Sequence, residues 1–161
     1  MKKIVLLFIL ITSTLVIFGQ KKPTEKFTTA GIHVLVPTGN LAKTNEYGLG
    51  MSIETEFIGK NNAGFTLNSG YNYYRGNGET KSIIQFPALA GFKYHFGGMV
   101  AFGQQFGASF ITQGYGLRFT YCSYISFGWD KIYSDLRFMG STTPGHENDL
   151  STLFLRVSYK L

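Results

Sequence analysis

Charged residues that could do chemistry recur two positions apart in this chain: Glu54 with Glu56, and Asp135 with Arg137. In extended backbone, residues two positions apart lie on the same face, so each pair presents both charges to one side. The same alternation assigns one shared face to three acidic and five basic residues: Glu54, Glu56, Lys93, Arg118, Asp135, Arg137, Arg156 and Lys160. Enclosed charges must pair or hold water, because an isolated buried charge is costly. The set predicts an interior ion-pair network, with a polar path for ions or small solutes as the alternative.

Catalysis would require a nucleophile, a base and an orienting group on a common face. By alternation, His33 and His95 share the face of the charged residues. Ser123 and Ser134 interrupt the opposite, apolar face and have no histidine partner there. We therefore expect no catalytic residue.

The segment from Ser141 to Asp149 is the one place where a cation could bind, through His146, Glu147 and Asp149. A solvated loop is the commoner explanation, because no metal-ligand spacing is matched. Cys122 is the single cysteine, which excludes an internal disulfide and a multi-cysteine metal site. We expect neither a metal nor a cofactor.

The elements that must position these residues are strands. Between Tyr47 and Phe57 the odd positions are mostly large and apolar, while Gly, Ser and Glu occupy the even positions. This is the two-residue period of a strand with unlike faces. The period recurs at residues 86–96, and six further segments share it: 32–36, 65–73, 100–110, 117–129, 132–138 and 153–161. The pattern predicts eight strands.

The connections between these strands alternate in length. Longer polar loops are expected at 37–46, 75–82 and 140–150, and tight turns at 59–62, 97–98 and 130–131; only the connection near 112–114 breaks the rhythm. An even number of antiparallel strands with this rhythm is typical of a closed outer-membrane barrel. Pro87 cannot donate to a ladder, so we expect a bulge there or a strand that begins after it.

Side-chain volume indicates which face of the barrel points outward. The apolar face carries more than twenty large side chains, about half of them aromatic. An eight-stranded barrel is too narrow to enclose them, whereas the Gly, Ser, Thr, Asn and Gln of the other face suit a narrow packed interior. The predicted fold is therefore all-β, an eight-stranded antiparallel up-and-down transmembrane β-barrel. The alternative is an inverted, soluble barrel.

Composition and the first residues agree with export. The chain has 161 residues, enough for one domain, with 15% charged and 16% aromatic residues, which excludes a disordered chain. Lys2, Lys3, the apolar run 4–18 and Gly19 form a signal-peptide pattern, since the run is shorter than the ~20 residues of a membrane-spanning helix. We expect a signal peptide at 1–19 and a barrel domain at 20–161. The modest excess of positive charge gives no reason to expect nucleic acid.

Four motifs carry a resemblance to a known family: Val36-Pro37-Thr38-Gly39, Tyr47-Gly48-Leu49-Gly50, the stretch 86–97 and the closing 155–161. Across essentially the whole chain after the signal, the sequence resembles the small outer-membrane β-barrel proteins of Gram-negative bacteria. The likeness is greatest to the Bacteroidota-type porin-like outer membrane protein barrel domain. This resemblance implies a place in the outer membrane, contact with membrane lipid and lipopolysaccharide, and insertion by the outer-membrane insertion machinery, which reads a closing strand similar to this one.

Together these observations predict a monomeric, non-enzymatic outer-membrane barrel with a packed polar interior. Its role would be structural, or a surface interaction through the extracellular loops with a ligand that the sequence does not name. The segment from Ser141 to Asp149 is the most exposed candidate for such contacts. The alternatives are a lipid-modifying outer-membrane enzyme and a narrow solute or ion channel.

Overall fold

Eight strands and one short 3-10 helix make up the described part of this chain. The computed structural model describes residues 25–78, 80–97, 99–142 and 149–161; the predicted signal peptide at 1–19 lies outside them. The elements are β1 (Glu25–Gly39), η1 (Leu41–Lys43), β2 (Asn45–Ile58), β3 (Ala63–Gly76), β4 (Ile83–His95), β5 (Val100–Ile111), β6 (Gly116–Trp129), β7 (Ile132–Thr142) and β8 (Leu150–Lys160). In the described residues, no helix is both long and apolar enough for a membrane span.

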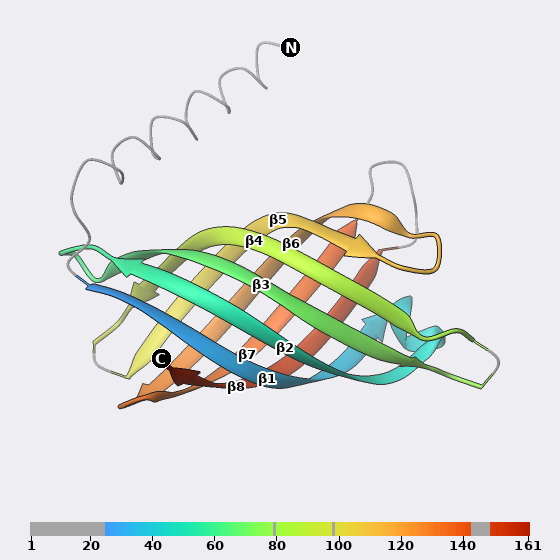
Figure 1. Cartoon of the computed structure of the whole chain (residues 1–161), viewed down its shortest axis with the longest axis horizontal. Helices are drawn as coiled ribbons and strands as arrows, with labels where there is room; N and C mark the ends of the chain where they lie inside the picture. Colours follow the sequence, from blue (N-terminus) through green and yellow to red (C-terminus); the bar gives the residue numbers. More distant parts are fainter. Residues whose placement is uncertain (1–24, 79, 98, 143–148) are drawn as a thin grey trace, which may run out of the picture.

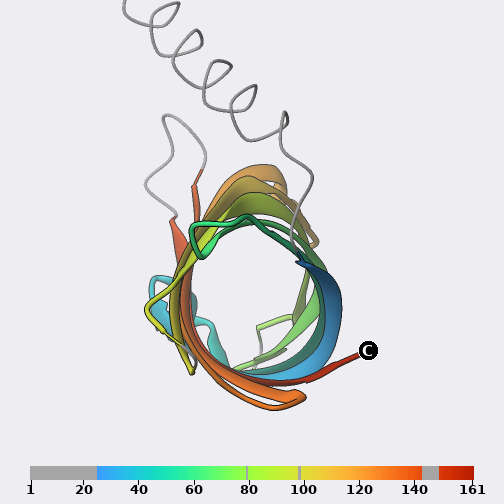
Figure 2. The same cartoon turned by 90° about the vertical axis from the view of Figure 1, so that its left-hand side faces the viewer.

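The strands form a closed antiparallel barrel. Each strand pairs with the next, and β8 pairs with β1, which closes the ring seen in Figure 2. Glu25 and Leu161 lie at one end, called here the termini end, and η1 lies at the opposite, loop end (Figure 1). The closed ring leaves no sheet edge unpaired, and it confirms the predicted fold class and strand number.

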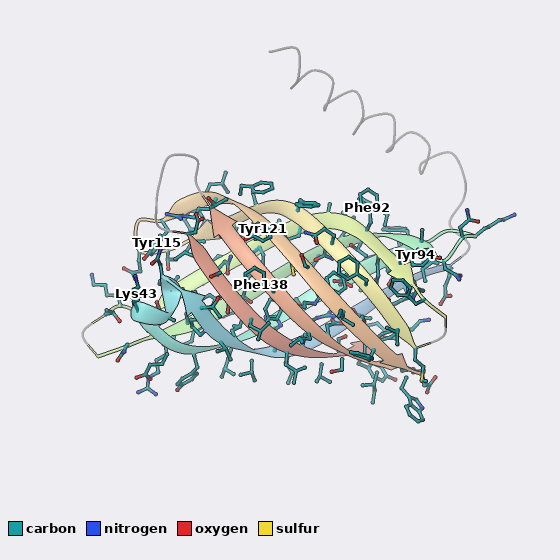
Figure 3. The ribbon with its side chains drawn as sticks, turned by 180° about the vertical axis from the view of Figure 1, so that it is seen from behind. Lys43, Phe92, Tyr94, Tyr115, Tyr121 and Phe138 are labelled. Atoms are coloured by element: carbon teal, nitrogen blue, oxygen red, sulfur yellow. The ribbon has the colours of Figure 1, made fainter. Side chains whose placement is uncertain are left out.

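Residues alternate between the wall's two surfaces as the two-residue period predicts. Large apolar side chains cover the outside, with Ile32 exposed by 71% and Leu117 by 72%. Phe92, Tyr121 and Phe138 point away from the ribbon in Figure 3. Polar and charged side chains point into the lumen and are buried there.

Small residues make room for the larger side chains that cross the lumen. A Cβ at Gly103 would overlap the Tyr124 ring, and one at Gly50 would overlap the His33 imidazole. These glycines therefore permit aromatic and heterocyclic rings to lie flat against the inner wall.

The longer connections are shorter than the sequence indicates. The loop expected at 37–46 shrinks because β1 continues to Gly39 and β2 begins at Asn45, with η1 between them. Likewise, β3 extends to Gly76 and β7 to Thr142. The extra residues are small or polar, so they show no apolar alternation although most of them still pair. Most of the loop expected at 140–150 lies outside the described residues.

Pro87 corrects a second expectation. It lies inside β4, four residues after the strand begins, and it pairs with Ser109 of β5. The register between β3 and β4 is the same on both sides of it, without a bulge, although the ladder is interrupted between Ser69–Ala88 and Asn72–Gln85, where Pro87 lies. A proline removes one donor but fits extended backbone, so its effect stays local. The irregularity that the ladders do contain lies between Asn45 and Gly48 of β2.

Candidate functional site

The lumen is the candidate site, because the chain concentrates its buried charge there. Six of the eight predicted charged residues are buried in the lumen and form ion pairs there. They come from four strands: Glu54 and Glu56 (β2), Lys93 (β4), Asp135 and Arg137 (β7), and Arg156 (β8). Strand alternation points each one inward, and barrel closure brings β2 opposite β7.

Arg137 lies at the centre of this network. Its Nη2 donates to Glu54 Oε2 at 2.8 Å and to Asp135 Oδ2 at 2.8 Å, and its Nε donates to the same Asp135 oxygen at 3.2 Å. The guanidinium also lies 4.2 Å from the centroid of the Tyr124 ring. One cation thus joins carboxylates from two different strands across the lumen.

Arg156 extends the network along β8. Its Nη1 donates to Asp135 Oδ2 at 2.9 Å and to Ser158 Oγ at 3.0 Å. Its Nε donates to Ser52 Oγ at 2.8 Å, and its Nη2 donates to Thr29 Oγ1 at 3.0 Å. The planar guanidinium therefore makes four contacts, one within its own strand β8 and one each with β1, β2 and β7, a geometry that a lysine could not reproduce.

Neutral amides complete the coordination of Glu54. Asn68 Nδ2 donates to Glu54 Oε2 at 3.0 Å, and Gln105 Nε2 donates to it at 3.1 Å. Gln105 also donates to Thr66 Oγ1 at 2.9 Å. Because these donors come from β3 and β5, the single carboxylate of Glu54 ties together both sides of the lumen.

A second cluster lies nearer the termini end. Glu56 accepts from Lys93 Nζ at 2.9 Å through one oxygen, and its other oxygen lies 2.5 Å from His95 Nε2. Lys93 Nζ also lies 5.5 Å from the centroid of the Tyr133 ring, which stacks on Phe27 at 5.7 Å. The aromatic pair and the charges together fill this end of the lumen.

Two predicted members lie elsewhere. Lys160 pairs with Glu25 at 2.6 Å at the rim, where both side chains are partly exposed. Arg118 lies toward the loop end, donates to the Tyr115 carbonyl at 3.4 Å and lies over that ring at 5.0 Å. Without these two, the central network has three acidic and three basic members and is formally neutral. Alternation assigns a residue to a face but not to a depth, which is why the sequence grouped all eight.

A layer of neutral polar side chains, which the sequence analysis missed, lies on the loop-end side of the charged residues. Gln85 Nε2 donates to Ser109 Oγ at 3.1 Å and to Ser141 Oγ at 3.0 Å. Gln85 Oε1 accepts from Asn72 at 3.2 Å and from the Tyr74 hydroxyl at 3.0 Å. The available signal was the run of polar residues at inward positions, which the search for charged residues passed over.

Apolar side chains close the loop end of the lumen. Leu35, Leu41, Tyr74, Ile83 and Ile111 belong to one buried cluster there. Two small cavities, each of about 10 Å³, lie inside the barrel. Each is about the size of one water molecule. Apart from these two cavities, side chains fill the lumen, as expected for the packed interior that the sequence predicts.

The candidate catalytic residues are dispersed. His33 Nε2 lies 2.7 Å from Asn72 Oδ1, and the His33 ring packs 5.0 Å from Phe154, whereas His95 belongs to the Glu56 cluster. Ser123 donates to Gln104 on the outer wall at 2.6 Å. His146 and Glu147 lie outside the described residues. Within the part of the chain that is described, no three His, Cys, Asp or Glu residues are grouped to hold a metal ion.

Comparison with known proteins gives matches of structure alone. No protein-family model matches the sequence, and no curated protein matches it. The crystal structure of Ail, the attachment invasion locus protein of Yersinia pestis, superposes with a TM-score of 0.61 at 13% identity, covering 84% of this chain and 97% of that one. Neisserial surface protein A (NspA) gives a TM-score of 0.54 at 13% identity, covering 84% and 97%. A de novo designed transmembrane β-barrel gives 0.56 at 10% identity, covering 88% and 98%. The likeness is one of fold.

Proposed function

We propose that this chain is a non-enzymatic outer-membrane barrel whose ion-paired lumen is a structural plug and whose loop end carries a surface interaction. The observation that carries the proposal is the distribution of side chains: apolar residues cover the outside while charges pair inside. This is the reverse of a water-soluble barrel. A closed ladder is also one of the two architectures that satisfy every backbone group in lipid.

Aromatic residues at both rims support a membrane-spanning position. Tyr94, Phe96, Trp129 and Tyr159 are exposed near the termini end, and Tyr47 and Tyr73 are exposed near the loop end. Figure 3 shows Tyr94 and Tyr115 toward opposite ends of the barrel. Aromatic girdles of this kind mark the two membrane interfaces of outer-membrane barrels.

The loop end faces the outside of the cell in this proposal, because termini in the periplasm place the longer connections on the opposite side. Partners are then membrane lipid and lipopolysaccharide around the wall, the insertion machinery during biogenesis, and an external ligand at the loops. The protein acts as a monomer and is exported by its N-terminal signal. Kinship with the Bacteroidota-type barrels rests on the sequence motifs.

The names of the structural neighbours fit a surface role. One is described as an attachment invasion locus protein and another as a surface protein. The buried, ion-paired side chains of the lumen favour a plug over a channel, since a conducting path requires a continuous water-filled bore and the two cavities inside the barrel measure only about 10 Å³ each.

Cell fractionation tests the location. We expect the protein in the outer-membrane fraction, β-rich by circular dichroism in detergent, and faster on a gel when unboiled than when boiled. Recovery as a detergent-free periplasmic monomer would contradict the proposal.

A further inference from the structure

An open groove crosses the outer wall of the barrel over β7, β8, β1, β2 and β3. Its volume is about 810 Å³, and it is lined mostly by apolar side chains. Ala30 and Ser69 form part of its floor, and Ile32, Met51 and Tyr71 stand along one side. The groove is a local depression in an otherwise large-residue surface.

Register explains the groove. Ala30 pairs with Ile53, which pairs with Ser69, so a small outward side chain lies on each side of Ile53 in one cross-strand row. In the next row toward the loop end, Ile32 pairs with Met51, which pairs with Tyr71. The small side chains of Ala30 and Ser69, beside a row of large ones, hollow the outer wall on both sides of Ile53 and leave a trough there.

A polar group lies directly beyond the groove on the same strands. Arg75 Nη1 donates to the Tyr47 hydroxyl at 2.8 Å, and the guanidinium lies 5.7 Å from that ring's centroid. The Tyr73 hydroxyl lies 3.0 Å from Ser82 Oγ. Tyr73 and Arg75 follow Tyr71 on the outward face of β3, so the Cα of Arg75 lies about 14 Å from that of Tyr71.

The Arg75 guanidinium is exposed and has capacity for an anion. None of the ion pairs in the described part of the chain involves Arg75. Glu46 acts on it electrostatically without forming such a pair. The bond to the Tyr47 hydroxyl uses one of the five N–H groups of the guanidinium. Guanidinium forks match phosphate oxygens well.

We propose that this wall binds a phosphate-bearing acylated lipid of the outer leaflet. The phosphate binds Arg75, and an acyl chain crosses the Leu49–Tyr73 pair and enters the groove between Met51 and Tyr71. A lipid fits both features, whereas a free phosphate would leave the trough unused. The inference rests on the proposed function, because that function places Arg75 in the outer leaflet.

The test uses the full-length mature protein in phosphatidylcholine nanodiscs doped with lipid A, with bound lipid counted by native mass spectrometry. Arg75→Gln should reduce retained lipid A roughly tenfold, since it removes a charge-assisted contact. Ser69→Leu should reduce it several-fold by filling the trough.

Two variants serve as matched controls. Ala108→Leu adds the same bulk on the outward face of β5, in a row continuous with Ser69, and it should retain lipid A as the wild type does. Lys131→Gln removes an exposed cation at the termini end and should do likewise.

The outcomes are distinct. Failure of the wild type to enter nanodiscs would overturn the proposed function, and is seen before lipid A is added. Normal insertion with equal retention by wild type and Arg75→Gln would overturn the lipid site alone. Equal retention of a fully dephosphorylated lipid A, or complete competition by millimolar inorganic phosphate, would also overturn it.

Discussion

Gln104 and Gln105 are adjacent, of one residue type, and on opposite faces of β5. Gln105 is buried and donates to Glu54 and Thr66 inside the lumen. Gln104 lies on the outer wall, where its carbonyl oxygen accepts from Ser123. The pair therefore compares a polar side chain in the lumen with one on the lipid-facing surface.

Replacing each glutamine with leucine should separate the two environments. Gln105→Leu should lower the free energy of unfolding by about 1–3 kcal/mol, because it removes two buried hydrogen bonds. Gln104→Leu should leave it within about 0.5 kcal/mol or raise it, since an apolar side chain suits a lipid contact. Urea unfolding of both variants in one lipid measures the difference. The reverse order would indicate that the outer wall faces water.

Arg137 has a larger predicted effect, because two buried carboxylates depend on its charge. Arg137→Met should cost about 3–5 kcal/mol of unfolding free energy, since it leaves Glu54 without its cation. Adding Glu54→Gln to that variant should restore part of the loss. The coupling from such a double-mutant cycle isolates the pair. Strictly additive losses would mean that the two side chains do not interact.

At the residue scale, the sequence predicted faces well and positions poorly. Alternation assigned Glu54 and Arg137 to the lumen because each strand has two unlike sides. It could not predict that Lys160 would reach the rim or that Arg118 would lie toward the loop end, because depth depends on the stagger between strands. The polar layer around Gln85 could have been predicted from its inward positions, but its members are neutral and a search for charged residues does not find them.

At the element scale, the strands owe their length to pairing partners. Pro37 and Thr38 lack an apolar alternation, yet both lie in β1 because β8 supplies partners at Thr152 and Ser151. Local pattern indicated that each strand exists, and barrel closure determined where it ends. The same reasoning explains Pro87, whose missing donor is too small a loss to end β4 when β5 still pairs with it.

The short helix η1 works as a cap on the lumen. Leu41 is buried in the apolar cluster at the loop end, beside Tyr74 and Ile83. Leu41→Ala should lower the unfolding free energy by about 2 kcal/mol without preventing assembly, because it leaves a cavity in one layer only. Ala42→Ser, at the exposed neighbouring position, provides the control. An unchanged unfolding midpoint for Leu41→Ala would show that η1 contributes nothing to closure.

At the scale of the whole molecule, the filled lumen predicts that the barrel does not conduct ions. Reconstituted in planar bilayers, the wild type should give no steady conductance, because the guanidinium groups of Arg137 and Arg156 span the bore and hold carboxylates on both sides. Single-channel recording over a range of voltages checks this. Large and reproducible openings would contradict the plug and favour a channel.

The ladder between β1 and β8 determines the order in which the barrel can assemble. The other seven ladders join strands that follow one another in the chain, whereas this one brings together residues as far apart as Glu25 and Lys160, 135 positions away. Such a contact forms slowly, because the intervening chain must first be ordered. Until it forms, the molecule is a curved open sheet with two bare edges, each able to pair with a strand of another chain. We therefore expect closure to be the slow, concentration-sensitive step of assembly. A helper that shields these two edges until they meet would then matter more than one that stabilises any single hairpin.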